Sequence, residues 1–157
     1  MQKISTCLWF NGQAEEAMNF YLSIFKNAKM TDVLRWGDVG PGPKGSVLTC
    51  SFELDGREFM ALNGGPQYQF TPAISLVVNC ETQAEVDHYW GKLLDCGKAV
   101  QCGWLTDRFG ISWQVVPTML PKLLMDKDTA KANRVMAAMM QMVKLDIAAL
   151  QQAADAH

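Results

Sequence analysis

Apolar runs and chain breaks in the N-terminal part of the sequence predict one strand, one helix and three further strands. The run 4–10 is typical of a strand, and Asn11-Gly12 ends it. Apolar residues then recur three and four positions apart over 13–26, which is the stripe of an amphipathic helix. The three further strands are predicted over 29–36, 46–54 and 57–63. Asp55-Gly56 joins the last two, and this dipeptide between apolar runs is the strongest short hairpin signal.

The same order of elements restarts after a linker at about 64–71. Residues 73–80 predict a strand, and Thr82 with Glu85 three residues later forms a capping box that begins a second helix. We expect Gly97 to end this helix in the left-handed conformation. Three short strands are predicted next, over 98–102, 104–106 and 111–116, with a turn at Arg108-Phe109-Gly110. Strand–helix–strand–strand–strand therefore occurs twice, which indicates an internal repeat.

Two such modules predict an α+β fold. One curved four-stranded sheet with a single helix leaves its other face uncovered, and pairing two such sheets would protect both faces and enclose a cleft. The predicted architecture is thus a cupped mixed-sheet pseudo-barrel of two βαβββ modules in a single domain. Module one spans about 1–66, module two about 70–117 and a C-terminal helical extension about 118–157.

The extension begins after Pro117, where the sequence becomes rich in good helix formers. Asp128 is the expected N-cap of a helix through Met142, and Asp146 of another. The stretch Met136–Met142 holds four methionines, which suit either packing on the chain's own sheets or an adaptable interface with a second copy.

Composition narrows the class of protein. The 157 residues suit one domain, and a 49% hydrophobic content allows a useful core. The net charge is −2 with no block of either sign, so we expect no nucleic-acid or membrane partner. The start of the chain lacks the apolar length of a signal peptide or spanning helix, which favours a cytoplasmic location. Five scattered cysteines favour buried thiols over disulfides or a zinc site.

One stretch resembles a known family. The run Cys-Gly-Trp-Leu-Thr-Asp-Arg-Phe-Gly-Ile-Ser-Trp-Gln-Val-Val-Pro from Cys102 to Pro117 is similar to the signature of the PhnB-like branch of the vicinal oxygen chelate superfamily. This branch also carries the label 3-demethylubiquinone-9 3-methyltransferase-like domain, and the superfamily includes glyoxalase I, bleomycin-resistance proteins and extradiol dioxygenases. Further matching stretches are Glu15-Glu16-Ala17 with Phe20-Tyr21 and Phe25, Asn63–Pro66 with Phe70–Ala73, and Met136–Met142. The resemblance implies the doubled fold already inferred and a homodimer.

The resemblance also raises the question of a metal. In metal-dependent relatives each module supplies two ligands, usually His, Glu or Gln, which suit Zn, Ni, Mn or Fe. The matching positions here are Thr6, about Asn63, Ala73 and Gln114, which offer no imidazole and no carboxylate. His88 lies beside Asp87 on the polar side of the second helix, and His157 is the last residue. We therefore expect no metal and no other cofactor.

Strand alternation assigns residues to the cleft. Thr6, Asn63, Ser75 and Gln114 share the parity of the former ligand positions and should face it, whereas Ile74, Leu76, Val78, Trp113 and Val115 should face the helices. Nearby aromatic residues complete the set of candidate ligand-binding residues: Thr6, Trp36, Phe59, Asn63, Ser75, Trp104 and Gln114. These polar groups either bind a small organic ligand or satisfy one another inside a filled barrel. The Gly- and Pro-rich loop 37–45 should be mobile, either as a lid or as a plain surface excursion.

Three functional hypotheses remain open. The first is a small-molecule-binding protein, in the manner of the metal-free bleomycin-resistance relatives. The second is an enzyme, metal-independent or of the methyltransferase kind its family label suggests, acting on a small 3-demethylubiquinone-like or glyoxalase-like substrate. The titrating side chains it could use are few, namely Glu53, Cys102, Asp107 and Arg108, and no catalytic residue can be assigned. The third is a structural or assembly role for the methionine-rich stretch.

Overall fold

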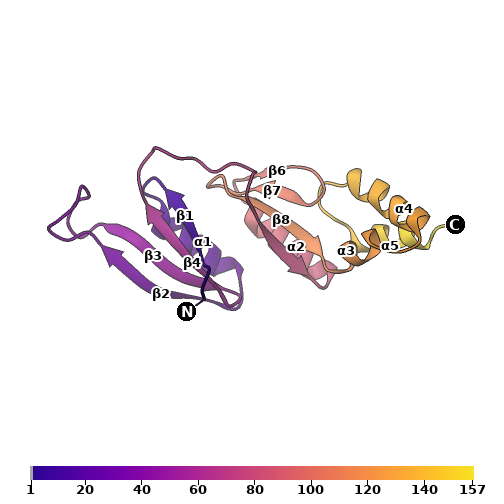
Figure 1. The fold of residues 1–157 in the computed structure, drawn as a ribbon, viewed down its shortest axis with the longest axis horizontal. Coiled ribbons are helices and arrows are strands. Elements are labelled where there is room, and N and C mark those ends of the chain that lie inside the picture. Colours follow the sequence, from indigo (N-terminus) through magenta and orange to yellow (C-terminus); the bar gives the residue numbers. More distant parts are fainter. Residues whose placement is uncertain (1) are drawn as a thin grey trace. The chain divides into compact units, whose positions relative to one another are not determined.

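In the computed structural model, which describes residues 2–157, a four-stranded mixed sheet with one helix forms the first of two units, Met1–Phe70 (Figure 1). Its elements in chain order are β1 (Thr6–Phe10), α1 (Ala14–Ile24), β2 (Ala28–Arg35), β3 (Val47–Leu54) and β4 (Arg57–Asn63). The strands lie in the order β1-β4-β3-β2, with β1 parallel to β4 and the other pairs antiparallel.

The second unit, Thr71–His157, repeats this topology. Its elements are β5 (Ser75–Cys80), α2 (Gln83–Leu94), β6 (Lys98–Ala99), β7 (Trp104–Thr106) and β8 (Ser112–Pro117). The strand order is β5-β8-β7-β6, and β5 is again parallel to β8. The two βαβββ modules predicted from the sequence are therefore confirmed, and the description of the chain as a single domain stays a prediction.

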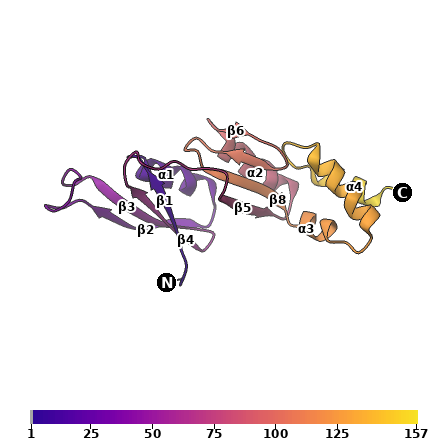
Figure 2. The same cartoon turned by 45° about the horizontal axis from the view of Figure 1, so that its top comes forward.

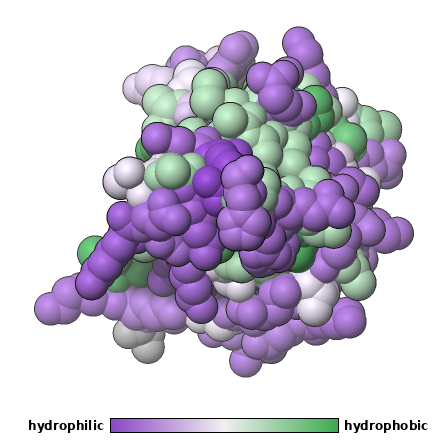
Figure 3. Space-filling model, turned by 90° about the vertical axis from the view of Figure 1, so that its right-hand side faces the viewer, coloured by the Kyte–Doolittle hydropathy of each residue, from purple (hydrophilic) through white to green (hydrophobic). Residues whose placement is uncertain are grey.

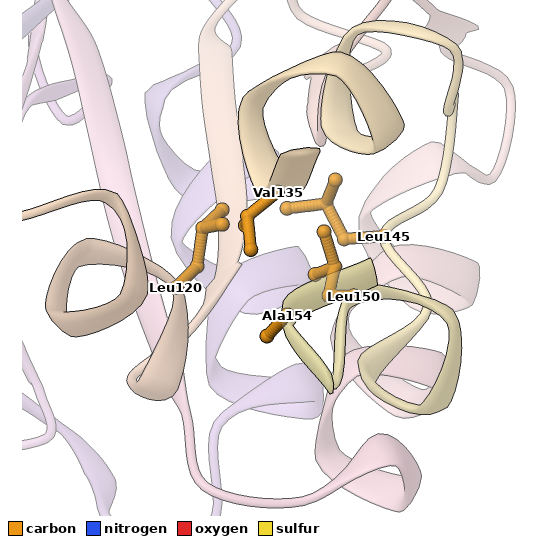
Figure 4. Close-up of a cluster of buried hydrophobic side chains, with 5 residues drawn as sticks. All are labelled: Leu120, Val135, Leu145, Leu150 and Ala154. Carbon is orange, nitrogen blue, oxygen red and sulfur yellow. The ribbon is translucent and has the colours of Figure 1, made fainter. Parts of the chain in front are cut away.

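Three helices complete the second unit: α3 (Met119–Leu124), α4 (Thr129–Met140) and α5 (Ile147–Asp155). In both Figure 1 and Figure 2 they follow β8 and lie beyond the end of its sheet. Their shared core is a cluster of five buried side chains, Leu120, Val135, Leu145, Leu150 and Ala154 (Figure 4). The predicted extension is thus confirmed, and it has a core of its own.

Side-chain hydrogen bonds cap two helices of this extension and attach it to α2. Asp128 and Asp146 cap α4 and α5 as expected, because their carboxylates accept from Lys131 N and Ala149 N. The Gln83 side chain at the start of α2 donates to Leu145 O and accepts from Ile147 N.

Seen from the side of the extension, hydrophilic residues cover most of the surface with hydrophobic patches between them (Figure 3).

Each sheet buries one face beneath its own helix. In the first unit the apolar stripe of α1, which includes Met18 and Tyr21, lies over the β3 residues Cys50, Phe52 and Leu54. In the second unit Val86, Trp90 and Leu93 of α2 are buried, as are Leu105, Trp113 and Val115 of the sheet. Leu76, Val78, Trp113 and Val115 therefore face the helix as predicted, whereas Ile74 precedes β5 and is exposed. The opposite face of each sheet is called here its open face.

The end of α2 differs from the prediction. Cys96, not Gly97, is the left-handed residue, with φ 60°. Gly97 is required for another reason, because a Cβ at this position would lie 2.3 Å from the Thr106 carbonyl oxygen. The chain therefore needs glycine here for a close approach of two backbones. The strand predicted over 98–102 is also shorter, since β6 ends at Ala99 and Cys102 lies in a turn.

Within residues 2–157 no helix combines the length and the apolar character needed to cross a bilayer.

Candidate functional site

Three of the seven predicted site residues come together on the open face of the second sheet. Ser75 and Gln114 lie on neighbouring strands, and Gln114 Nε2 donates a hydrogen bond of 2.9 Å to Ser75 Oγ. Trp104 is the register partner of Gln114 on the other side, and its side chain is half-buried. A neutral amide, a hydroxyl and an indole are thus adjacent on one surface.

The rest of this open face carries little charge. Register pairing places further residues of β5, β7 and β8 on it: Val77, Asn79 and Thr106 are at least partly exposed, Ser112 is buried, and Val116 packs against the core of the extension. None of these side chains titrates, and the register adds one basic residue, Lys98 of the edge strand, opposite Thr106. Such a surface suits a small neutral molecule that accepts or donates a few hydrogen bonds.

The face assigned to three other candidates is wrong. Thr6 shares the parity of Leu8 and Phe10, which are buried on the helix side of the first sheet. Phe59 is the register partner of both Thr6 and Phe52, and its ring stacks on Phe52 at 5.6 Å. Thr6 and Phe59 therefore lie on the face that α1 covers.

Asn63 also lies on the helix side, where it has a structural task. Its Oδ1 accepts a hydrogen bond of 2.9 Å from Ala14 N, the first residue of α1, and its Nδ2 donates to Val47 O. The helix N-terminus has no cap from its own Gln13 side chain, so Asn63 satisfies a free backbone donor from a distant strand. Both ends of the amide are used within the first unit.

Trp36, the seventh candidate, packs against the loop that follows it. A Cβ at Gly40 or Gly42 would come 2.1 Å or 2.0 Å from the indole ring, so the loop folds closely around this side chain. Gly45 N donates to Trp36 O, and Lys44 pairs with Asp38 at 2.8 Å. The loop 37–45 is thus organised around Trp36, and its proposed role as a lid stays a prediction.

Apart from Glu53, the residues that do occupy the open face of the first sheet were not among the sequence candidates. Alternation and register place there Cys7, Trp9, Thr49, Ser51, Glu53, Glu58, Met60 and Leu62. Trp9 is half-buried, and its indole N–H donates to Gly65 O at 2.9 Å. Partial desolvation raises the pKa of the Cys7 thiol although the residue is exposed, so the thiol stays protonated near neutral pH, which disfavours a nucleophilic role.

Three of the four titrating candidates have structural partners for their titrating side chains. Glu53 forms an ion pair of 3.4 Å with Lys29, and Arg108 one of 2.8 Å with Asp95. Cys102 has φ 57° in the turn before β7, and its N–H donates to Met142 O. The fourth candidate, Asp107, is only 3% exposed, so its carboxylate depends on partners within the protein.

Asp107 organises the turn between β7 and β8. Its Oδ1 accepts from Phe109 N at 2.9 Å and from Ile111 N at 3.0 Å, and its Oδ2 accepts from Trp113 Nε1 at 2.9 Å. These contacts explain the spacing Asp-Arg-Phe-Gly-Ile-Ser-Trp in physical terms, because one carboxylate ties the turn to the buried indole. Asp107 therefore stabilises the turn that the sequence predicts at Arg108-Phe109-Gly110.

The four positions matched to metal ligands do not form a ligand set. Within the first unit Thr6 and Asn63 lie on the helix side, and the Asn63 amide is already hydrogen-bonded to Ala14 N and Val47 O. In the second unit the Ala73 side chain has no atom that can bind a metal, and Gln114 is hydrogen-bonded to Ser75. Among residues 2–157, no group of three or more His, Cys, Asp or Glu is arranged to hold a metal ion. These four residues do not fit the ion that metal-dependent relatives would bind there.

Comparison with known proteins gives a consistent family. The family described as 3-demethylubiquinone-9 3-methyltransferase matches residues 2–116. Because this match ends before the helical extension, the resemblance of Met136–Met142 stays a prediction. Among curated proteins, none matches the chain significantly.

Solved structures agree with that match. The PhnB protein from Bacillus cereus is 40% identical, with a TM-score of 0.69 over 74% of this chain and 100% of that chain. Protein PA1353 from Pseudomonas aeruginosa is 21% identical, with a TM-score of 0.63 over 74% of this chain and 98% of its own, and it shares the fold. The fosfomycin resistance protein FosX from Listeria monocytogenes also shares it, at 14% identity and a TM-score of 0.54 over 78% of this chain and 97% of its own. The chain belongs to the 3-demethylubiquinone-9 3-methyltransferase family.

Proposed function

We propose that this protein binds a small neutral organic molecule on the open face of its second sheet, without a metal ion. The observation that carries the proposal is the hydrogen-bonded pair Gln114–Ser75 beside the half-buried Trp104. The amide and hydroxyl can exchange their mutual bond for bonds to a ligand, and the indole supplies apolar contact area. Such a binder would act in the cytoplasm.

An enzyme acting on a quinone-like or glyoxalase-like substrate is the alternative. Acid–base catalysis needs a titrating side chain within hydrogen-bond reach of the reacting atom. The partners of Glu53, Asp107 and Arg108 supply structural reasons for those residues, and the open-face side chains of β5, β7 and β8 are neutral. Binding without chemistry is therefore the function we favour.

Replacement of Gln114 by leucine is expected to weaken ligand binding about 5- to 10-fold, because one ligand hydrogen bond to an amide is lost. Trp104→Ala should weaken it by about tenfold or more through lost aromatic contact. Isothermal titration with quinones, aromatic antibiotics and glutathione adducts measures both effects. Gln152→Leu is the matched control, since Gln152 is exposed on α5.

The same compounds separate binding from catalysis. A thermal shift without turnover agrees with the proposal, and elemental analysis of the purified protein should give no stoichiometric transition metal. Metal-dependent turnover of a glutathione hemithioacetal, or equal affinities for the wild type and Gln114→Leu, would reject it.

We also propose a homodimer. Its support is the exposure of apolar side chains on the extension, namely Met125, Met136, Met140 and Val143. Met139 and Met142 pack instead against the extension's own core.

A further inference from the structure

We infer that Trp9 is a rigid stacking platform for a planar, uncharged aromatic ring on the open face of the first sheet. The inference rests on the proposed function in one respect only, that the protein binds small organic molecules. It concerns a different sheet from Gln114 and a residue outside the stretch Cys102–Pro117.

The orientation of the indole is fixed from three directions. Its N–H donates to Gly65 O at 2.9 Å, and its ring meets Tyr68 edge-on at 4.9 Å. Its six-membered ring lies so close to Gly64 that a Cβ there would be 2.4 Å from Cζ2. A side chain held in this way loses little conformational entropy when a ligand stacks on it.

The short segment Gly64-Gly65 is the device that holds the ring. Both residues donate their N–H groups to Phe10 O, at 2.9 Å and 3.4 Å, so the segment continues alongside the end of β1. Gly64 gives the ring room, and Gly65, at φ 109°, turns its carbonyl group toward the indole N–H. Because this hydrogen bond satisfies the indole N–H, the half-buried ring offers a ligand only the apolar part that Gly64 and Tyr68 leave uncovered.

The neighbours of Trp9 on the open face select for an uncharged ring. Leu62 is its register partner on β4, and Thr49 is the partner of Leu62 on β3. Lys29 and Asp32 of the edge strand β2 also share this face, opposite Glu53 and Ser51. The charged residues of β3 and β4 on it, Glu53 and Glu58, form a cross-strand pair four residues along β4 from Leu62. At about 3.4 Å per residue this separates them from the Trp9 end by more than about 10 Å. The local chemistry is therefore apolar and polarizable.

Two probes of similar shape test the inference, 2-naphthol and its saturated counterpart decahydro-2-naphthol. The wild type should bind 2-naphthol at least about fivefold more tightly, since stacking adds to the contact area that both probes share. Trp9→Leu should abolish this preference, and Trp9→Phe should keep part of it. Gly64→Ala keeps the tryptophan but pushes its ring out of position, so this variant should reduce the preference for 2-naphthol. Trp36→Leu is the control and should keep it fully, because Trp36 packs in its own loop.

Equal binding of the two probes, no binding of 2-naphthol, or an unchanged preference in Trp9→Leu would overturn the inference. The proposed function fails in a different way, through Gln114→Leu. If the naphthol preference depends on Trp9 while Gln114→Leu changes the affinity of no ligand, the stacking platform stands and the site on the second sheet is wrong.

Discussion

Asp107→Ala is expected to lower the free energy of unfolding by about 3–5 kcal/mol, because it leaves buried donors without an acceptor. The carboxylate accepts from Phe109 N, Ile111 N and Trp113 Nε1, and all three contacts are lost at once. Each buried donor left unsatisfied costs about 1–3 kcal/mol. Urea denaturation followed by tryptophan fluorescence and by circular dichroism measures the loss.

Two further variants locate the cause of this loss. Asp107→Asn keeps one acceptor but can direct its amide hydrogens at the indole N–H of Trp113, so we expect an intermediate loss of about 2 kcal/mol. Trp113→Phe removes the indole N–H and with it this conflict. It should therefore lower the free energy of unfolding less in the Asp107→Asn background than in the wild type. Asp155→Ala is the control, since Asp155 is exposed and accepts a hydrogen bond from Gln151 on the same helix. A loss below about 1 kcal/mol for Asp107→Ala would contradict the structural role.

Gly97→Ala is expected to destabilise the protein by about 2–3 kcal/mol through overpacking. Its new Cβ would lie 2.3 Å from Thr106 O and 3.1 Å from the Cα of Asp107, and both are backbone atoms that no side-chain rotation can move away. The expected result is a lower urea midpoint with an unchanged slope.

Two neighbouring substitutions should have the opposite sign. Cys96→Gly relieves a non-glycine residue at φ 60° and should stabilise by about 0.5–1 kcal/mol. Gly91→Ala, in the interior of α2 where a Cβ meets nothing within 4 Å, should stabilise by a similar amount, about 0.5–1 kcal/mol. If Gly97→Ala is neutral while Gly91→Ala stabilises, the close approach of the two backbones is not the reason for Gly97.

The order of the elements could be predicted from the sequence because its signals are local. Asp55-Gly56 lies between β3 and β4, and Thr82 caps α2 by accepting from Glu85 N. In the standard capping box this glutamate accepts from the backbone N–H of the N-cap residue, whereas here the Glu85 carboxylate accepts from Glu81 N. Each of these features depends on a few neighbouring residues, which is why pattern reasoning locates it.

The faces of the first sheet could not be predicted from β1 alone. Cys7, Leu8, Trp9 and Phe10 are all apolar, so the strand shows no alternation that separates its two sides. The neighbouring hairpin of β3 and β4 does identify the helix side of the sheet. A two-residue Asp-Gly turn pairs Leu54 with Arg57, which places Phe59 opposite Phe52 and assigns it to the helix side. Asn63 follows by the same alternation.

Tertiary contacts account for the remaining differences. Gly97 reads as a helix stop in the sequence, and only the backbone of Thr106 shows why glycine is needed. The role of Asn63 depends on the helix start at Ala14, which lies 49 positions away in the chain. Only the packing of the indole against Gly64 and Gly65 identifies Trp9 as a candidate.

Indole and side-chain amide signals in a two-dimensional ¹⁵N NMR titration test the proposed binding face most directly. With the tightest ligand of the quinone, antibiotic and glutathione-adduct panel, the Trp104 indole and the Gln114 amide should shift together. The indoles of Trp90 and Trp113, buried at 7% and 3% exposure on the helix side, should stay in place. Shifts confined to Trp90 and Trp113, or a saturating ligand that leaves Trp104 and Gln114 unmoved, would contradict the account.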